Sequence, residues 1–422
     1  MVKAAPRPTA DTQTLAEIPT RADAGTRADG ATRVDTPSPV EAPERDTRWV
    51  RRVLRTYGLS RLLVLAAALV ATTGTDPGAG PWPVIPRPHV ALLRALARWD
   101  GAWYIDIAQH GYHHVKIPPG GDAGYAFFPF YPWLIRAGSW ITTASPLVVA
   151  LLLATVLGGV GAVLIRILTA QAFDERVADR AATLFCFFPG AFVLSMAYTE
   201  ALTIAAVAAS ILALTKRRWV LAGVLGAVAA MTRPTGAVLI LAAGWCAVAA
   251  WRRGEGRRPF SAPALTGAGL AVVVVSQWVQ TGHALEWLHV EHVTWQDHSG
   301  FTIGIFQRFM DFVHAGTLGF GTGDLNDPVW AGGFLIALVG AWLLVRRRLP
   351  AVLTIYGLGA LLFAASSFNV GPRPRPLLAA FPVVIAIAAS VSGWKWRVVL
   401  VASTLGLIAM SLLTFLTLSA VP

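Results

Sequence analysis

Long apolar runs separated by short polar stretches fill most of the chain after residue 47. A helix needs about 20 predominantly apolar residues to cross the hydrocarbon core of a bilayer. Runs of this kind predict membrane-spanning helices over 56–73, 146–168, 263–280, 328–345, 351–366, 377–392 and 398–418. Two longer stretches carry polar breaks, MAYTEA and TRPTG, and divide into the spans 181–197 and 199–215 and two short spans within 219–251. The pattern predicts an all-α, polytopic membrane protein with roughly eleven crossings.

The basic residues give an orientation, because cytoplasmic loops of membrane proteins carry an excess of Lys and Arg. With these spans, every basic cluster falls on the same side: Arg45 to Arg55, Arg166 to Arg180, Lys216 to Arg218, Arg252 to Arg258, Arg346 to Arg348, and Lys395 with Arg397. An error of one crossing would break this alternation. We therefore expect a multi-pass protein of the plasma membrane with a cytoplasmic N-terminus and with the long loops 74–145 and 281–327 outside.

Composition supports the membrane assignment. The chain is 55% hydrophobic and only 14% charged, whereas soluble proteins carry about 25% charged residues. This excludes an ordinary soluble enzyme and a disulfide scaffold. The net charge of +12 does not indicate a nucleic-acid partner, because the basic residues lie between apolar runs rather than on one soluble surface. Cys186 and Cys246 lie inside apolar runs and are expected to be small buried hydrophobes.

The first 47 residues differ from the rest and are rich in Ala, Pro, Thr, Asp and Arg. Such a segment cannot bury enough apolar surface to offset its ordering entropy. We expect residues 1–47 to form a disordered cytoplasmic tail and residues 48–422 to form the membrane domain. No apolar core follows the first residues, so the tail does not have the pattern of a signal peptide.

The first candidate site is RWDGAWYIDIAQHGY at 98–112. Helical periodicity over 90–112 predicts a helix lying along the outer membrane surface with its apolar face down. Asp100 stands near three aromatic residues, Trp99, Trp103 and Tyr104, where a partly desolvated carboxylate suits a general base. The alternative is a solvated acidic residue beside an aromatic belt. Asp106 is six residues further on and points away from Asp100 on a helix, although both can line one cleft.

Two further motifs are candidates for substrate binding. In AFFPFYPWLIR at 126–136, aromatic side chains such as Tyr131 can stack on a sugar or an isoprenoid, or simply anchor the loop in the interface. In MAYTEA at 196–201, Glu200 is a carboxylate at membrane depth, which is costly and usually functional. The alternative is a wet turn in which Glu200 only caps the following helix.

Arginines on the predicted outer side require partners, because the positive-inside rule disfavours them there. These are Arg233 in TRPTG and the pair Arg373 and Arg375 in GPRPRP. A lipid-linked phosphate is a suitable partner, since guanidinium groups bind phosphate bidentately. The alternatives are anionic lipid headgroups or the carboxylates Asp100 and Glu200. The HVEH sequence at 289–292 is only a weak metal motif, and we expect neither a metal nor a cofactor.

Taken in order, five motifs resemble the PIG-V-type mannosyltransferases, the bacterial relatives of the enzyme that adds the second mannose to the GPI anchor. They are RWDGAWYIDIAQHGY, AFFPFYPWLIR, FPGAFVLSMAYTEAL, MTRPTGAVL and RPRPLLAAFP. The resemblance covers roughly residues 50–395. It implies a fold of the GT-C glycosyltransferase type, with the active site at the outer membrane face and a polyprenyl-phosphate sugar, usually mannose, as donor.

The same resemblance assigns roles to individual residues. It makes Asp100 the catalytic base beside Trp99, places Tyr198 and Glu200 in the tyrosine-threonine-glutamate motif, and brings Arg233 near the site. In the last motif Arg375 fits the arginine of the family, but Pro376 replaces an aromatic residue. Which of Arg373 and Arg375 is functional stays open.

The expected activity is transfer of mannose from polyprenyl-phosphate mannose to an acceptor hydroxyl of a glycan, glycolipid or protein, with inversion at the anomeric carbon. A transporter or lipid flippase is the alternative, since it too would have many spans and intramembrane charges. That class predicts internal repeats and charges near the bilayer midplane. The sequence has no clear repeat, and its unusual charges gather at one predicted face.

Overall fold

The computed structural model describes residues 47–73, 90–112, 116–117, 121–295, 310, 313–314, 326–367 and 371–417. For 116–117, 121–122 and 326–327 only the backbone is described. Of the predicted tail over 1–47, only Thr47 is among the described residues. Residues 74–89 of the predicted outer loop 74–145 and most of residues 296–325 also lie outside them.

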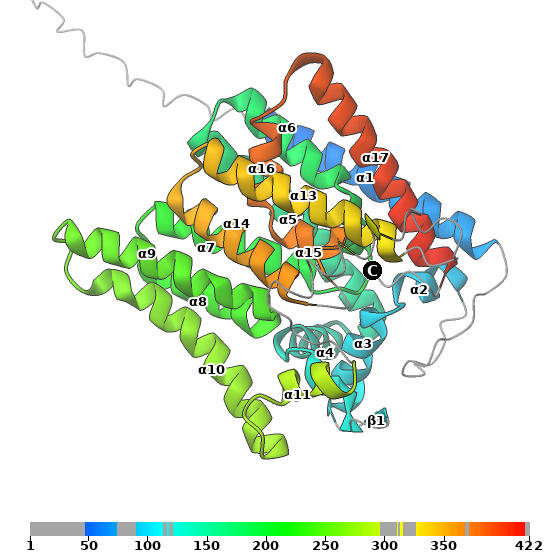
Figure 1. Ribbon diagram of the computed structural model, residues 1–422. Helices are drawn as coiled ribbons and strands as arrows, with labels where there is room; N and C mark the ends of the chain where they lie inside the picture. The colour runs from blue at the N-terminus through cyan, green and yellow to red at the C-terminus, as the bar shows by residue number, and fades with distance from the viewer. Residues whose placement is uncertain are drawn as a thin grey trace, which may run out of the picture. The chain divides into compact units, whose positions relative to one another are not determined.

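Helices make up nearly all of the described chain (Figure 1). In order, the larger ones are α1 (Arg48–Thr72), α2 (Ala91–Leu96), α3 (Asp100–His110), α4 (Phe130–Thr142), α5 (Pro146–Ala172), α6 (Glu175–Phe187), α7 (Glu200–Thr215), α8 (Trp219–Thr232), α9 (Leu239–Arg252), α10 (Ser261–Thr281), α11 (Glu286–Val293), α13 (Asn326–Arg346), α14 (Ala351–Ser366), α15 (Pro374–Ala379), α16 (Pro382–Ala388) and α17 (Gly393–Leu416). Short 3₁₀ helices are η2 (Ala123–Ala126), η3 (Pro189–Ser195), η4 (Pro234–Val238) and η5 (Arg258–Phe260). The strands β1 (Lys116–Ile117) and β2 (Gly121–Asp122) form a two-residue antiparallel hairpin.

The prediction of an all-α, polytopic membrane protein is confirmed. Among the described residues, six helical segments are long and apolar enough to cross a membrane. The pair α6 and η3 is long and apolar enough only when taken together, and it is bent by 70° at the break between them. Three apolar helices are shorter, namely α7, α8 and α14. Each predicted span contains a helix. The predicted number of eleven crossings is not confirmed, because some of these helices are shorter than a full membrane span.

The two polar breaks in the sequence are real breaks in the helices. At TRPTG, α8 ends at Thr232 and the chain continues through η4 into α9. Gly236 is required there, because a Cβ atom at this position would lie 2.1 Å from the carbonyl oxygen of Ala229. At the other break, α6 and η3 lead through residues 196–199 into α7.

Two predicted elements differ in the structure. The single helix expected over 90–112 is two helices, α2 and α3, separated by a tight turn at residues 97–99, and α3 is buried over Gly101–Ala108 rather than lying with one face exposed. The span expected over 377–392 is divided into α15 and α16, because Pro382 at the start of α16 cannot donate a hydrogen bond to continue α15.

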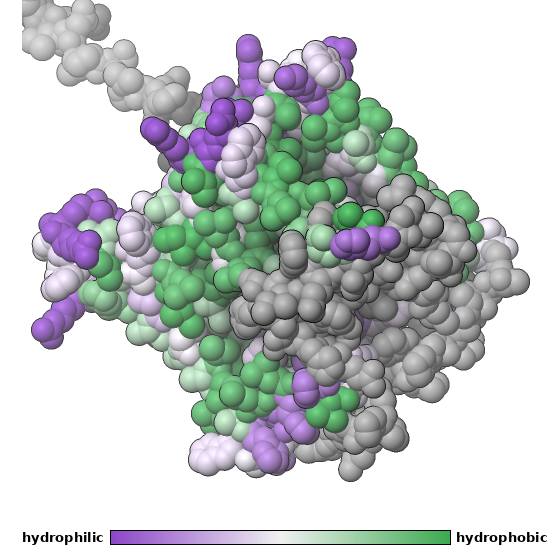
Figure 2. Space-filling view, viewed as in Figure 1, coloured by the Kyte–Doolittle hydropathy of each residue, from purple (hydrophilic) through white to green (hydrophobic). Residues whose placement is uncertain are grey.

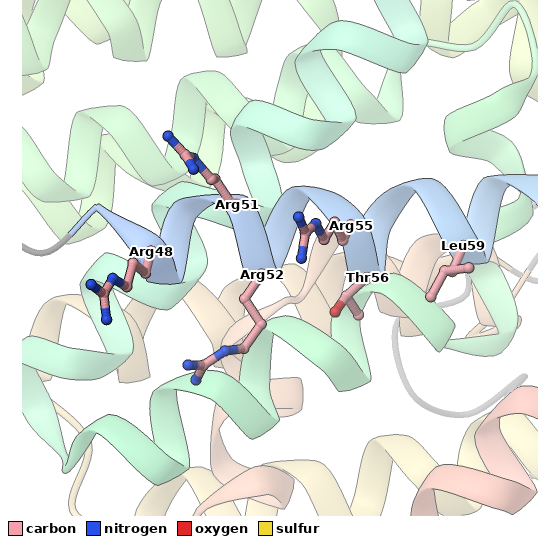
Figure 3. A pocket seen from close by; sticks show the side chains of 6 residues that line it. All are labelled: Arg48, Arg51, Arg52, Arg55, Thr56 and Leu59. Atoms are coloured by element: carbon pink, nitrogen blue, oxygen red, sulfur yellow. The ribbon is translucent and has the colours of Figure 1, made fainter.

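Several of the basic clusters from which the orientation is predicted stand at helix ends: at the start of α1, at the ends of α9 and α13, and near the start of α17. Figure 2 shows hydrophilic side chains along the upper and left edges of the molecule and again in its lower part, with hydrophobic side chains between these regions. Near the start of α1, an open groove is lined by side chains that are mostly arginine: Arg48, Arg51, Arg52, Arg55, Thr56 and Leu59 (Figure 3). Arg166 nearby contacts Glu175 and Asp179. This end is the predicted cytoplasmic one.

Candidate active site

Asp100 is the first residue of α3, directly after a strained turn. Trp99 has φ 58° and ψ −131°, in a region that non-glycine residues rarely adopt. The turn directs the chain into α3 so that the Asp100 carboxylate stands at the positive end of the helix dipole, which stabilises a negative charge. The Asp100 side chain is 26% exposed. It is therefore anchored by its helix and still open to a small reactant.

The MAYTEA break lies beside the turn at Trp99. The backbone N–H of Ala197 donates to the carbonyl oxygen of Leu96 over 3.1 Å. Gly101 permits this approach, since a Cβ atom there would lie 3.3 Å from the Cβ of Ala197. The backbone of residues 196–200 is thereby fixed against α3, and Glu200 is carried to the same place as Asp100.

Glu200 is the first residue of α7 and is 1% exposed. The alternative that Glu200 only caps a wet turn is therefore wrong. A buried carboxylate must be paired, and the partner of Glu200 is Arg233, whose Nη1 lies 2.7 Å from Glu200 Oε1. The same Nη1 donates to Thr199 Oγ1 over 3.1 Å. Of the partners considered for Arg233 in the sequence, the structure shows the carboxylate of Glu200.

Arg375 joins the two carboxylates. Its Nη1 lies 2.6 Å from Asp100 Oδ2, and its Nε lies 3.2 Å from Glu200 Oε1. The guanidinium also stands over the ring of Tyr198, 5.2 Å from the ring centroid. The site is consequently a network of two carboxylates and two guanidinium groups, contributed by α3, α7, α15 and the residue that precedes η4.

Arg375 reaches this position because η3 and α15 approach each other closely. Gly190 in η3 faces the backbone of Pro374 and Arg375, and a Cβ atom at Gly190 would lie 2.0 Å from the carbonyl oxygen of Pro374. Only glycine leaves room for that contact. Gly190 stands in the FPGAFVL motif, but no local feature of the sequence indicates its contact with Pro374.

Charge sets the protonation of Arg375. Burial works to lower the pKa of this guanidinium, but the carboxylates of Asp100 and Glu200 outweigh burial and raise its pKa above the usual value. Arg375 is therefore a permanent cation. Burial also raises the pKa of Tyr104, although the Arg233 charge opposes this. Tyr104 stays a neutral hydroxyl, which shares a 3.3 Å hydrogen bond with Thr199.

The remaining predicted site residues lie around the network rather than in it. Trp99 donates from its indole N–H to the carbonyl oxygen of Thr414 over 3.4 Å. Trp103 stacks on Phe127 at 5.5 Å between ring centroids. The Tyr131 hydroxyl donates to the carbonyl oxygen of Ala150 over 3.0 Å, and its buried ring meets the edge of Tyr104.

Asp106 and Arg373 are also outside the pairs described above. Asp106 Oδ1 lies 2.8 Å from Nδ1 of His110, one helical turn further along α3, as expected for a residue that points away from Asp100. Arg373 is 4% exposed and precedes α15. The sequence left open whether Arg373 or Arg375 is the functional arginine. In the structure Arg375 contacts Asp100 and Glu200. No group of three His, Cys, Asp or Glu side chains suited to a metal occurs among the described residues.

Comparison with solved structures finds chains of low sequence identity. An oligosaccharyltransferase of Archaeoglobus fulgidus tethered with an acceptor peptide is 15% identical, with a TM-score of 0.48, over 89% of this chain and 56% of the other. ArnT from Cupriavidus metallidurans bound to undecaprenyl phosphate is 17% identical, with a TM-score of 0.46, over 85% of this chain and 63% of the other. The chain thus spans less than two thirds of these proteins. No curated protein matches the sequence.

A family model does match part of the sequence. Residues 83–247 match the model described as Mannosyltransferase (PIG-V). The matched segment contains four of the five motifs, and the RPRPLLAAFP motif with Arg375 lies after it. The resemblance to the PIG-V mannosyltransferases indicated by the motifs is thereby confirmed over residues 83–247, the segment that carries Asp100, Glu200 and Arg233.

Proposed function

We propose that this membrane protein is a glycosyltransferase that moves mannose from polyprenyl-phosphate mannose to an acceptor hydroxyl, with inversion, at the outer face of the plasma membrane. The observation that carries the proposal is the network of Asp100, Glu200, Arg233 and Arg375. It joins a partly exposed carboxylate to fixed cations, and the family match covers three of its four residues. A glycan, glycolipid or protein can supply the hydroxyl.

Asp100 is the base in this mechanism. It accepts the proton of the acceptor hydroxyl while the acceptor oxygen bonds to the anomeric carbon of the sugar. The bond between that carbon and the phosphate oxygen breaks, and polyprenyl phosphate leaves with the bonding electrons. Attack from the face opposite the phosphate inverts the configuration. One correctly placed base contributes about 10²–10⁴-fold to the rate.

The arginines act on the leaving group. Arg375 and Arg233 are cations held in place before the substrate arrives, and fixed cations stabilise the negative charge that develops on the departing phosphate. In the structure Arg375 contacts Asp100 at 2.6 Å. A phosphate competes for this guanidinium, and its arrival loosens the hold of Arg375 on Asp100. Donor binding thereby prepares the carboxylate to accept a proton.

Glu200 has a different part. With its side chain 2% exposed and both arginines against Oε1, it is too enclosed to receive an acceptor. Together with Asp100 it balances the charge of the two cations when the site is empty, and it fixes where their guanidinium groups stand. We therefore assign Glu200 to positioning of the arginines and Asp100 to the chemistry.

The test uses membranes that contain the wild type or Asp100→Asn, supplied with labelled polyprenyl-phosphate mannose. Asp179→Asn, which alters two ion pairs at the predicted cytoplasmic end, with Arg52 and Arg166, is the matched control. We expect label to pass to an acceptor with the wild type and the control but not with Asp100→Asn. Equal transfer by all three would contradict the role of Asp100. No transfer by any of them would exclude this donor. Other polyprenyl-phosphate sugars would then be tested as donors, and after them the alternative that the protein is a transporter.

A further inference from the structure

The two residues before Asp100 are bonded to the end of the last helix. Arg98 Nη1 donates to the carbonyl oxygen of Phe415 over 2.7 Å. The indole N–H of Trp99 donates to the carbonyl oxygen of Thr414 over 3.4 Å. Both acceptors belong to the final turn of α17, whose lower end lies beside α2 in Figure 1.

The end of a helix is a good partner for an arginine. The last four carbonyl groups of a helix have no partner within the helix, and they carry the negative end of its dipole. A guanidinium that bonds to them satisfies an acceptor and gains from the dipole. The contact between Arg98 and Phe415 thus fixes α17 to the turn that precedes the proposed base.

That turn needs external support. Trp99 has φ 58°, a conformation that is unfavourable for a non-glycine residue and persists only where surrounding contacts hold it. The Trp99 side chain is 5% exposed, and its indole bonds to α17. Asp100 follows directly, so the direction of its carboxylate depends on this turn. The contacts to α17 therefore help to hold the Trp99 turn and, with it, the direction of the Asp100 carboxylate.

The same helix also supports the other half of the site. Ser403 Oγ, in the middle of α17, donates to the carbonyl oxygen of Phe187 over 3.0 Å. Gly406 allows close contact with Pro189, since a Cβ atom there would lie 2.9 Å from Pro189 Cγ. Phe187 and Pro189 stand where α6 turns into η3, the segment that holds Gly190 against α15 and leads to Glu200. One helix therefore contacts the supports of both carboxylates.

We propose that α17 is a positioning element of the active site and that Arg98 is a positioning residue for Asp100. Arg98 acts by bonding to the C-terminal carbonyl of α17 and thereby holding the strained Trp99 turn. The inference rests on the proposed function, because it concerns the placement of the proposed base. It assigns a role to residues 393–416, which lie outside the segment that matches the family model.

The first test separates turnover from binding with Arg98→Gln in the donor assay. Because misplacement of a catalytic group by about 1 Å costs up to roughly 10²-fold, kcat should fall by about 10- to 100-fold, with KM for the donor within about threefold of the wild type. Arg98→Lys should recover part of the loss, since an ammonium group can still donate to Phe415. Arg252→Gln, at an exposed arginine at the end of α9, is the control and should retain wild-type kcat. A raised KM with unchanged kcat, or wild-type kinetics, would overturn the proposal.

A second test asks whether Arg98 acts through Asp100. In an Asp100→Glu background the carboxylate is already displaced by one methylene group, so adding Arg98→Gln should reduce kcat by less than about twofold. A second full loss would show that Arg98 acts independently and would overturn the inference. If Arg98→Gln does not fold, Trp99→Phe takes its place, because it removes the indole N–H that bonds to Thr414 and keeps an aromatic ring at the turn, and the same two outcomes decide. Failure of the proposed function would be recognised by a different result, namely full activity of Asp100→Asn.

Discussion

Replacing Glu200 by Gln tests whether the charge network holds the site together. The substitution keeps the size of the side chain and an oxygen acceptor but removes the negative charge that faces Arg233 at 2.7 Å and Arg375 at 3.2 Å. The two guanidinium groups are then left with one carboxylate, Asp100, which contacts Arg375. We expect lower stability and lower transferase activity.

The magnitude follows from the burial of the pair. The side chains of Glu200 and Arg233 are 2% and 20% exposed. Hydrogen bonds to charged groups contribute about 1.5–3 kcal/mol and neutral ones about 0.5–1.5 kcal/mol. Losing the charge therefore costs about 1–1.5 kcal/mol at the hydrogen bond from Arg233 and a similar amount at the ion pair with Arg375, about 2–3 kcal/mol in all. This is below the roughly 3–5 kcal/mol for deleting one partner of a buried pair, since Gln keeps one acceptor. With about 2.1 cal/mol/K of unfolding entropy per residue, the described part of the chain should lose about 3–4 °C in Tm.

The assay is thermal unfolding of the purified protein in detergent, with Glu175→Gln as control. Glu175 also pairs with an arginine, Arg166, but its side chain is 72% exposed. Exposed pairs contribute little, so this variant should unfold within about 1 °C of the wild type. Equal Tm values for Glu200→Gln and Glu175→Gln would refute the argument that the network is a buried, stabilising feature.

Three further predictions concern the surroundings of the network. Gly190→Ala should displace Arg375 and lower kcat, at a cost of about 1–3 kcal/mol in stability, because its Cβ would lie 2.0 Å from the carbonyl oxygen of Pro374. Gly244→Ala is the control and should leave kcat unchanged, because nothing lies within 4 Å of a Cβ atom at that position. Equal kinetics of the two variants would count against the close contact at Gly190. Arg375→Gln should reduce transfer more than Arg373→Gln, because Arg375 contacts both carboxylates; the reverse order would assign the phosphate to Arg373. Burial raises the pKa of Tyr104 and Tyr131 in the folded protein above the pKa near 10 of the unfolded chain. The stability that these neutral hydroxyls contribute is therefore fully present below about pH 10 and is lost as the pH rises through the pKa of the folded state. Tm should thus be steady to about pH 9.5 and fall above pH 10, with tyrosinate absorbance appearing only on unfolding; absorbance that rises before unfolding would contradict the burial of these hydroxyls.

The helical membrane class and the two broken spans were predictable because apolar runs and polar interruptions are local properties of the sequence. MAYTEA and TRPTG place polar groups where a continuous span would leave them in hydrocarbon, and the structure breaks the helices there. The same reasoning identified Asp100, Glu200 and Arg233 as unusual on the predicted outer side. The grouping of these residues followed from their positions relative to the spans.

The pairing inside the site could not be predicted in the same way. Asp100 and Arg375 are separated by 275 residues, and no periodicity relates two segments so far apart. The turn at Trp99 was also hidden, because a positive φ is usually indicated by Gly or Asn and here the residue is Trp. Helical periodicity over 90–112 continues through that turn, so it predicted one helix in place of α2 and α3. Tertiary contacts with α17 outweigh the local preference.

The most direct test of the central claim is single turnover of purified protein with labelled polyprenyl-phosphate mannose and an excess of the acceptor identified from membranes. Binding of the donor is measured in the same samples. If Asp100 is the base and the arginines hold the phosphate, Asp100→Asn should bind the donor within about threefold of the wild type and transfer the sugar about 10²–10⁴-fold more slowly. Transfer by Asp100→Asn at the wild-type rate would contradict the account.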